Sequence, residues 1–195
     1  MKEGQINMTK EKAWMGIIGN EHIKRALIVA MAGGHTMGVI GTSRNGKREL
    51  QAILGKKVIV SASCPCGGLG EAQGYCTCTP AKIRKFRTTG KYRRLQFQDI
   101  IVNVVTPRWG DYERASKGLS FKEALAEAKI ETTGLSLAIH PDALYLLKSW
   151  VERYFPVMEA VNSAKRVAET IAQLAKDNEV KAHHMAEALQ YKMPM

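Results

Sequence analysis

Apolar residues along the first half of the chain follow two alternating patterns. Short apolar runs typical of buried strands occupy residues 36–40, 57–61 and 99–105. Three- and four-residue spacing across residues 20–32 predicts an amphipathic helix, with Asn20 as its N-cap. A second helix is expected to begin near Gly46 and to end at Gly55. Strands that alternate with helices at these lengths predict a parallel α/β sheet.

The second half of the chain is helical in pattern. Helices are expected at residues 121–129, 141–154, 158–176 and 181–191. The predicted inner face of the second of these consists of Leu144, Leu147, Trp150 and Val151. We therefore predict an N-terminal segment (1–18), an α/β core (19–110), a connecting segment (111–135) and an all-helical lid domain (136–195).

The loop after the first predicted strand has the skeleton of a phosphate-binding loop. Its glycines would let backbone N–H groups surround a phosphate, and its lysine would reach the outer phosphates. The expected Ser or Thr ligand for Mg²⁺ is replaced by Arg48, which cannot hold a metal, so Mg²⁺ binding is doubtful. The candidate nucleotide-binding residues are Gly41, Asn45, Gly46, Lys47 and Arg48. The alternative is an inherited strand-to-helix turn with a solvated lysine.

All four cysteines of the chain are clustered in one Cys-x-Cys-x9-Cys-x-Cys pattern. Four thiolates suffice for a closed tetrahedral Zn²⁺ site, and a reducing compartment would not favour disulfides. The candidate metal ligands are Cys64, Cys66, Cys76 and Cys78. The alternative is four reduced thiols in a flexible loop.

The formal net charge of +11 is concentrated in one stretch, residues 81–94, which contains no acidic residue. Such a concentration predicts a polyanionic partner, nucleic acid or nucleotide phosphate. Phe86 and Tyr92 are interleaved with the cations, as in surfaces that stack on single-stranded nucleic acid. The alternative is a solvated helix face on which Ile83 and Phe86 anchor the core. The candidate nucleic-acid-binding residues are Lys82, Arg84, Lys85, Arg87, Lys91, Arg93 and Arg94.

Other features of the sequence are less informative. No apolar run of about 18 residues and no cleavable leader pattern is present, so we expect a cytoplasmic protein. We expect His183 and His184 on the surface at a helix start, and His35 beside the phosphate loop.

Three stretches of the sequence resemble the magnesium-chelatase-like branch of the AAA+ ATPases, most closely the ComM type of competence-associated helicases. They read GNEHIKRALIVAMAGGH, CPCGGLGEAQGYCTCTPAKIRKFR and AETIAQLAKDNEVKAHHMAEALQY. The resemblance implies a P-loop core with a helical lid, assembly into hexameric rings, and ATP hydrolysis coupled to remodelling of DNA junctions.

The sequence departs from that family at the elements that hydrolysis needs. The strand that ends in an acidic pair is absent, since only about ten residues separate Lys47 from Val58. Ala62 stands at the position of a sensing asparagine, Phe97 at that of an arginine, and Glu159 at that of a second sensor arginine. The core is therefore expected to be truncated, with little or no ATP hydrolysis.

These observations leave three functional hypotheses. The first is a degenerate AAA+ protein that retains some nucleotide binding and binds nucleic acid or a partner ATPase ring. The second is an ATP-binding subunit of a DNA-remodelling ring, homo- or hetero-oligomeric, that another chain completes. The third is a structural zinc-binding module.

Overall fold

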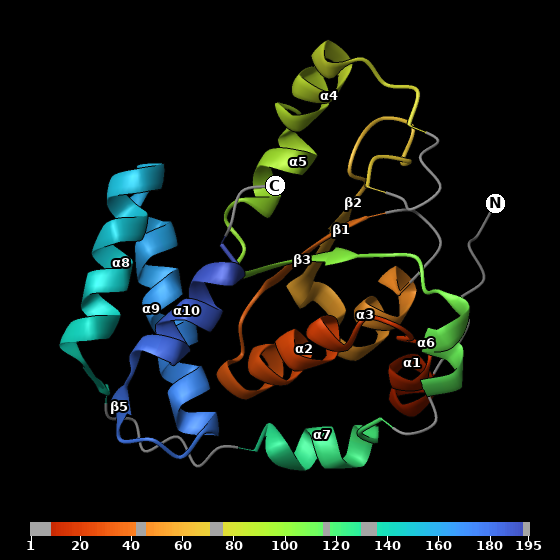
Figure 1. The fold of residues 1–195 in the computed structure, drawn as a ribbon. Helices are drawn as coiled ribbons and strands as arrows, with labels where there is room; N and C mark the ends of the chain where they lie inside the picture. Colours follow the sequence, from red (N-terminus) through yellow and green to blue (C-terminus); the bar gives the residue numbers. More distant parts are fainter. Residues whose placement is uncertain (1–8, 42–45, 71–75, 115–117, 130–135, 193–195) are drawn as a thin grey trace.

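The computed structural model describes residues 9–41, 46–70, 76–114, 118–129 and 136–192, and all structural statements below concern these. Three strands form a small sheet at the centre of Figure 1, flanked by helices on both faces. The strands are β1 (Met37–Gly41), β2 (Val58–Ser61) and β3 (Ile100–Val104). β1 lies in the middle and runs parallel to both neighbours, which confirms the predicted parallel sheet.

The helices that precede and connect the three strands lie on opposite faces of the sheet (Figure 1). Helices α2 (Glu21–Gly33) and α3 (Lys47–Leu54) cover one face, and a short 3-10 turn, Gly55–Lys57, leads into β2. Helices α4 (Pro80–Arg87) and α5 (Gly90–Leu95) connect β2 to β3 across the other face.

Alternation along β1 explains why both faces are apolar. Met37 and Val39 belong to the main core with α2 and α3, whereas Ile40 packs with Tyr92 and Leu95 of α5. Successive side chains of a strand point to opposite faces, so a five-residue buried strand supplies both cores.

The N-terminal segment contains a helix that the sequence pattern did not predict, α1 (Lys10–Met15). Trp14 is 1% exposed, and its indole N–H donates to the carbonyl of Leu119 at 2.7 Å. Its ring lies 5.9 Å from that of Phe121, the first residue of α7 (Phe121–Glu127). α1 is therefore held by the connecting segment. Helix α6 (Trp109–Arg114) crosses the predicted boundary between the α/β core and that segment.

Asn20 is the N-cap residue of α2, as predicted, but its side chain makes no capping hydrogen bond. The amide instead donates to the carbonyls of Ile18 and Val105 and accepts from the N–H of Val105. Asn20 is 2% exposed and pairs with the backbone beyond β3, a role that local sequence does not reveal.

The C-terminal part contains α8 (Pro141–Tyr154), α9 (Met158–Leu174) and α10 (Ala182–Gln190). It is not wholly helical, since β4 (Ala138–Ile139) and β5 (Glu179–Val180) form a two-stranded parallel pair. The inner face of α8 also differs from the prediction. Leu144 is 38% exposed, whereas Ala143, Leu147 and Trp150 are buried at the four- and three-residue spacing of a helix.

No helix among the described residues is long and apolar enough to cross a membrane.

Candidate functional site

The carboxyl ends of the three parallel strands meet at one edge of the sheet, where the sequence places its glycine loop. A Cβ atom at Gly41 would lie 2.4 Å from the carbonyl oxygen of Val104, so β1 can approach β3 here only with glycine. Gly46 has a φ of +70° immediately before α3. Both glycines of the motif therefore have a structural reason within the strand-to-helix connection.

Lys47 lies at this edge and is bound to the backbone of the sheet. Its ammonium donates to the carbonyl of Gly41 at 2.6 Å and to that of Ser61 at 3.1 Å. It joins the ends of β1 and β2 and is not simply solvated, as the alternative assumed. Arg48 is exposed, and Asn45 lies outside the described residues. Gly41, Gly46 and Lys47 are thus the predicted nucleotide-binding residues that the structure brings together.

The four cysteines lie together although nine residues separate the two pairs. The Sγ atom of Cys64 lies 3.4 Å from that of Cys66 and 3.7 Å from that of Cys76. All four sulfur atoms, including that of Cys78, lie within 4.8 Å of one another. A Zn–S distance of about 2.3 Å gives a tetrahedron with edges of about 3.8 Å. The cluster therefore fits a metal ion such as zinc.

The protonation of these thiols is uneven. Hydrogen bonds, first from the backbone of Gly68 and then from neighbouring thiols, lower the pKa of Cys66 to about 6. The Cys76 thiol accepts a backbone hydrogen bond from Cys78, which lowers its pKa. Desolvation and the neighbouring thiols outweigh that bond and raise the pKa of Cys76 to about 11. Four thiolates at these distances would repel one another, and a divalent cation would remove that cost.

All seven predicted nucleic-acid-binding cations belong to the connection formed by α4 and α5, which we call the basic arm (residues 80–95). The arm rises from the sheet at the top of Figure 1, and α4 contains no fully buried residue. The side chain of Lys91 lies outside the described residues, and that of Arg87 is half-buried. The exposed cations of the arm are Lys82, Arg84, Lys85, Arg93 and Arg94.

The two aromatic residues of the arm attach it to the sheet. The rings of Phe86 and Tyr92 meet edge to face with centroids 5.8 Å apart. Tyr92 is 7% exposed and packs with Ile40 and Leu95, so its ring is not available to stack on a base. Phe86 and Ile83 are half-buried, as the helix-face alternative expected.

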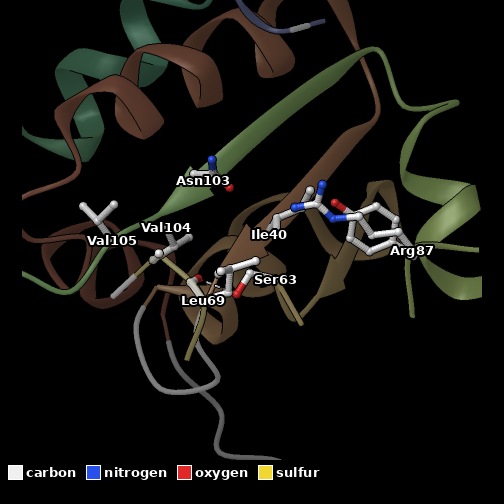
Figure 2. Close-up of a pocket in the computed structure, with 10 residues that line it drawn as sticks. Ile40, Ser63, Leu69, Arg87, Asn103, Val104 and Val105 are labelled. Carbon is white, nitrogen blue, oxygen red and sulfur yellow. Dashed lines mark hydrogen bonds between the residues drawn. The ribbon is translucent and has the colours of Figure 1, made fainter. Parts of the chain in front are cut away.

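Figure 2 shows a cavity of about 210 Å³ at the carboxyl edge of the sheet, which we call the edge cavity. It lies where β1 and β3 end, beside the cysteine loop and the end of α4. Its wall consists of Ile40, Gly41, Ser63, Leu69, Gly70, Arg87, Tyr92, Asn103, Val104 and Val105.

The junction between the sheet and the helical part centres on Asp99, just before β3. Its carboxylate accepts hydrogen bonds from the N–H and hydroxyl of Thr36, the hydroxyl of Ser163 and the guanidinium of Arg166. Partial burial raises the pKa of Asp99, but these hydrogen bonds outweigh it and hold the pKa well below its usual value. Sequence reasoning did not identify this junction, because its only local signal was a carboxylate at the start of a buried strand.

Two substituted family positions lie near this junction. Phe97 is 59% exposed. Glu159 lies 3.2 Å from the Arg166 guanidinium, which also binds Asp99. Arg166 belongs to α9 and lies about two helical turns beyond Glu159, the position that the resemblance pointed to.

Two histidine predictions were wrong. His184 is 1% exposed, because its ring faces inward at the start of α10 and its Nδ1 accepts from the N–H of Lys181. His35 lies against α9, with Nε2 2.8 Å from the hydroxyl of Thr170, and not beside the loop. His183 is exposed, as predicted.

Asp177, His183 and His184 lie close enough together to hold a metal, but their hydrogen bonds oppose it. Because Nδ1 of His184 accepts a hydrogen bond, the neutral ring carries its proton on Nε2, which faces Asp177 at 3.3 Å. The carboxylate of Asp177 already accepts a hydrogen bond from the ammonium of Lys181, with Oδ1 and Nζ 2.7 Å apart.

Comparison with known proteins gives one match and one negative result. No curated protein matches the chain. Residues 99–192, just under half of the chain, match the family model described as magnesium chelatase, subunit ChlI C-terminal. The matched residues begin at Asp99 and contain β3 and all of α8, α9 and α10. This match supports a magnesium-chelatase-like family for the chain, and its C-terminal helical part is consistent with that family.

Proposed function

We propose that this chain is a degenerate AAA+-related protein, similar to the ComM type, that binds nucleic acid through the basic arm and has little or no ATPase activity. The observation that carries the proposal is the arm itself. It presents five exposed cations, and residues 81–94 contain no acid to neutralise them. Cations concentrated on a projecting element suit the phosphates of a nucleic acid strand.

The hydrogen bonds of the Lys47 ammonium support the proposal that the chain has little or no ATPase activity. A catalytic lysine must reach the outer phosphates of the nucleotide, whereas this ammonium holds the carbonyls of Gly41 and Ser61. The missing acidic strand and the exposed Arg48 leave Mg²⁺ without its usual ligands in this chain. Residual nucleotide binding would therefore be weak and independent of Mg²⁺.

The cysteine cluster gives the arm a fixed base. Cys64 is buried just after β2, and Cys78 stands immediately before Thr79, whose hydroxyl caps α4. A zinc ion held by the four cysteines would tie the end of the sheet to the start of the arm. In this proposal the zinc is structural, because four thiolates leave no open coordination position.

Binding of fluorescent single- and double-stranded oligonucleotides, measured by anisotropy over a range of salt, tests the proposal. Replacing Lys82, Arg84 and Lys85 by Gln should weaken binding at least tenfold and reduce the salt slope by about 2. A matched control replaces three exposed lysines outside the arm, Lys122 of α7, Lys148 of α8 and Lys165 of α9, by Gln. It has the same net charge, so an equal loss in both variants, or no binding by the wild type at low salt, would contradict a role for the arm.

The rival hypothesis, an ATP-binding subunit completed by another chain, is favoured by Gly46, whose φ of +70° immediately before α3 suits a strand-to-helix turn at a phosphate site. It predicts ATP binding that strengthens with Mg²⁺ and is lost in Lys47→Ala. We expect neither, and titration with labelled ATP with and without Mg²⁺ separates the two hypotheses.

A further inference from the structure

Three aromatic residues belong to the basic arm or directly follow it, and they differ in what they contact. Phe86 and Tyr92 meet each other and attach the arm to the sheet. Phe97, two residues after the end of α5, is 59% exposed and belongs to neither apolar core of the described residues. The ring of Phe97 is therefore open to a contact from outside the chain.

Phe97 lies on the same side of the arm as two exposed arginines. Its N–H donates to the carbonyl of Arg94 at 3.4 Å, so the winding of α5 continues through a further turn. Residues three and four positions apart on such a turn are neighbours on one face, which places Phe97 beside Arg94 and Arg93. Cations that hold phosphates next to a ring that stacks on bases are the two parts of a single-strand binding surface.

A second exposed ring lies at the turn between α8 and α9. Phe155, the residue that ends α8, is 85% exposed and has a φ of +46°. A bulky side chain is disfavoured in this left-handed conformation, which Gly and Asn adopt more readily. The ring neither gains from burial nor suits its backbone, so the fold itself supplies no reason for an aromatic residue here.

The two rings border one apolar hollow. A cavity of about 390 Å³, which we call the junction cavity, separates the end of the arm from the turn between α8 and α9. Its wall includes Gln96, which precedes Phe97, and Pro156, which follows Phe155. No acidic side chain is among the described residues that line the cavity. The apolar surface at the end of the arm therefore continues onto the helical part without an opposing charge.

We propose that Phe97 and Phe155 are base-stacking residues, on which unpaired bases of a nucleic acid strand lie while the basic arm holds its phosphates. The inference rests on the proposed nucleic-acid binding and specifies its ligand as single-stranded. The bases of a duplex are already stacked and paired, whereas those of a single strand expose their faces to aromatic side chains.

Charge favours a nucleic acid over a protein as the molecule that covers these rings. Residues 81–94 contain no acid, and Arg93 and Arg94 adjoin Phe97. A strand offers phosphates to these arginines and apolar base faces to the rings at the same time. Stacking on an aromatic face also tolerates any base, so this surface would bind with little sequence preference.

The test measures anisotropy with three labelled oligonucleotides of equal length: a single strand, the duplex of the same sequence, and an abasic single strand. Phe97→Ala should weaken binding of the normal single strand at least about fivefold, the lower limit for losing one stacked base. Its affinity for the duplex and the abasic strand should not change. The salt slope should also stay unchanged, because no phosphate contact is lost. Phe97→Trp should bind the single strand at least as tightly as the wild type.

Phe155→Asn separates binding from stability at the second ring. It should weaken single-strand binding several-fold and leave the thermal midpoint unchanged or raise it, because Asn accepts the left-handed conformation. Tyr145→Ala is the matched control, since this ring is 71% exposed on α8 about 15 Å along the helix from Phe155. It should leave all three affinities unaltered.

Four results would overturn the inference. Unchanged single-strand affinity in Phe97→Ala and Phe155→Asn would remove the stacking role and leave binding by the arm standing. Equal losses for the normal and abasic strands would show that no base is stacked. Self-association of the wild type that Phe155→Asn abolishes, without an effect on oligonucleotide affinity, would assign the ring to a contact between copies. No binding of any oligonucleotide by the wild type would end both proposals.

Discussion

Asp99 accepts hydrogen bonds from Thr36, before β1, and from Ser163 and Arg166 of α9, so one carboxylate joins the sheet to the helical part. Its side chain is only 15% exposed, whereas Glu159, the other carboxylate bound to Arg166, is 60% exposed. The same guanidinium therefore makes one pair that is shielded from solvent and one that is screened by it. Asp99 therefore contributes more to the stability of this junction than Glu159 does.

Asp99→Asn should lower the free energy of unfolding by about 2–3 kcal/mol, because an amide cannot accept from every donor and its NH₂ group faces some of them. Urea denaturation at neutral pH measures the change. Glu159→Gln is the matched control and should cost less than about 0.5 kcal/mol. Similar losses in both variants would show that Asp99 has no special role.

The buried imidazole of His35 should make the stability of the protein depend on pH. Burial lowers its pKa below 6.5, and Asp99 only partly opposes this. The native ring stays neutral, so the unfolded chain takes up a proton first as the pH falls through about 6.5. This contribution to stability is complete above that pH and is lost below it. His184, whose pKa burial also lowers, acts in the same direction.

Urea titrations between about pH 7.5 and 5.5 should therefore show falling stability, by at most about 1.4 kcal/mol per pH unit for each histidine. His35→Gln should reduce this slope, and His22→Gln, which alters an exposed ring, should leave it unchanged. If His35→Gln left this slope unchanged, groups other than His35 would account for the whole pH dependence.

At the scale of elements, the basic arm depends on its two ends for its position. Helix α4 buries no residue fully, so packing along its length contributes little. Its C-terminal end is held by Phe86 against Tyr92, and its N-terminal end follows directly from Cys76 and Cys78. Metal binding is the interaction that would fix the N-terminal end.

Removal of zinc should therefore weaken nucleic-acid binding without unfolding the sheet. We expect about one zinc per chain by metal analysis, its loss in Cys78→Ser, and a several-fold fall in oligonucleotide affinity after chelation. The thermal midpoint of the main core should change less than the affinity does. Metal-free wild-type protein with unaltered affinity would contradict this coupling.

At the scale of the whole molecule, several contacts join parts that are distant in sequence. Arg25 of α2 pairs with Glu187 of α10 at 2.9 Å and with Glu127 of α7 at 3.3 Å. The N–H of Ile101 donates to the carbonyl of Tyr191, so the chain after α10 lies along β3. The core of buried residues also runs without a break from α1 to α10.

The sheet and the helical part should consequently unfold together. Tryptophan fluorescence, which reports on both Trp14 and Trp150, and far-ultraviolet circular dichroism should give coincident urea transitions. Two resolved transitions would show that residues 136–192 form a separate folding unit, as the predicted domain boundary implies.

The sequence alone determined the elements whose signal is local. β-branched runs marked the three parallel strands, glycines marked the turns around α3, and helical spacing marked α2, α8 and α9, because periodicity records which side of each element is buried. It also placed the four cysteines in one motif. Only the tertiary structure decided which partners these elements found. The roles of Asp99 and Asn20 depend on groups that are distant in sequence, and the role of His184 depends on its ring facing inward. No spacing rule predicts the directions in which the side chains of Lys47 and Arg87 point. A polar side chain is positioned by the donors and acceptors that folding brings to it, and those become neighbours only when the chain has packed.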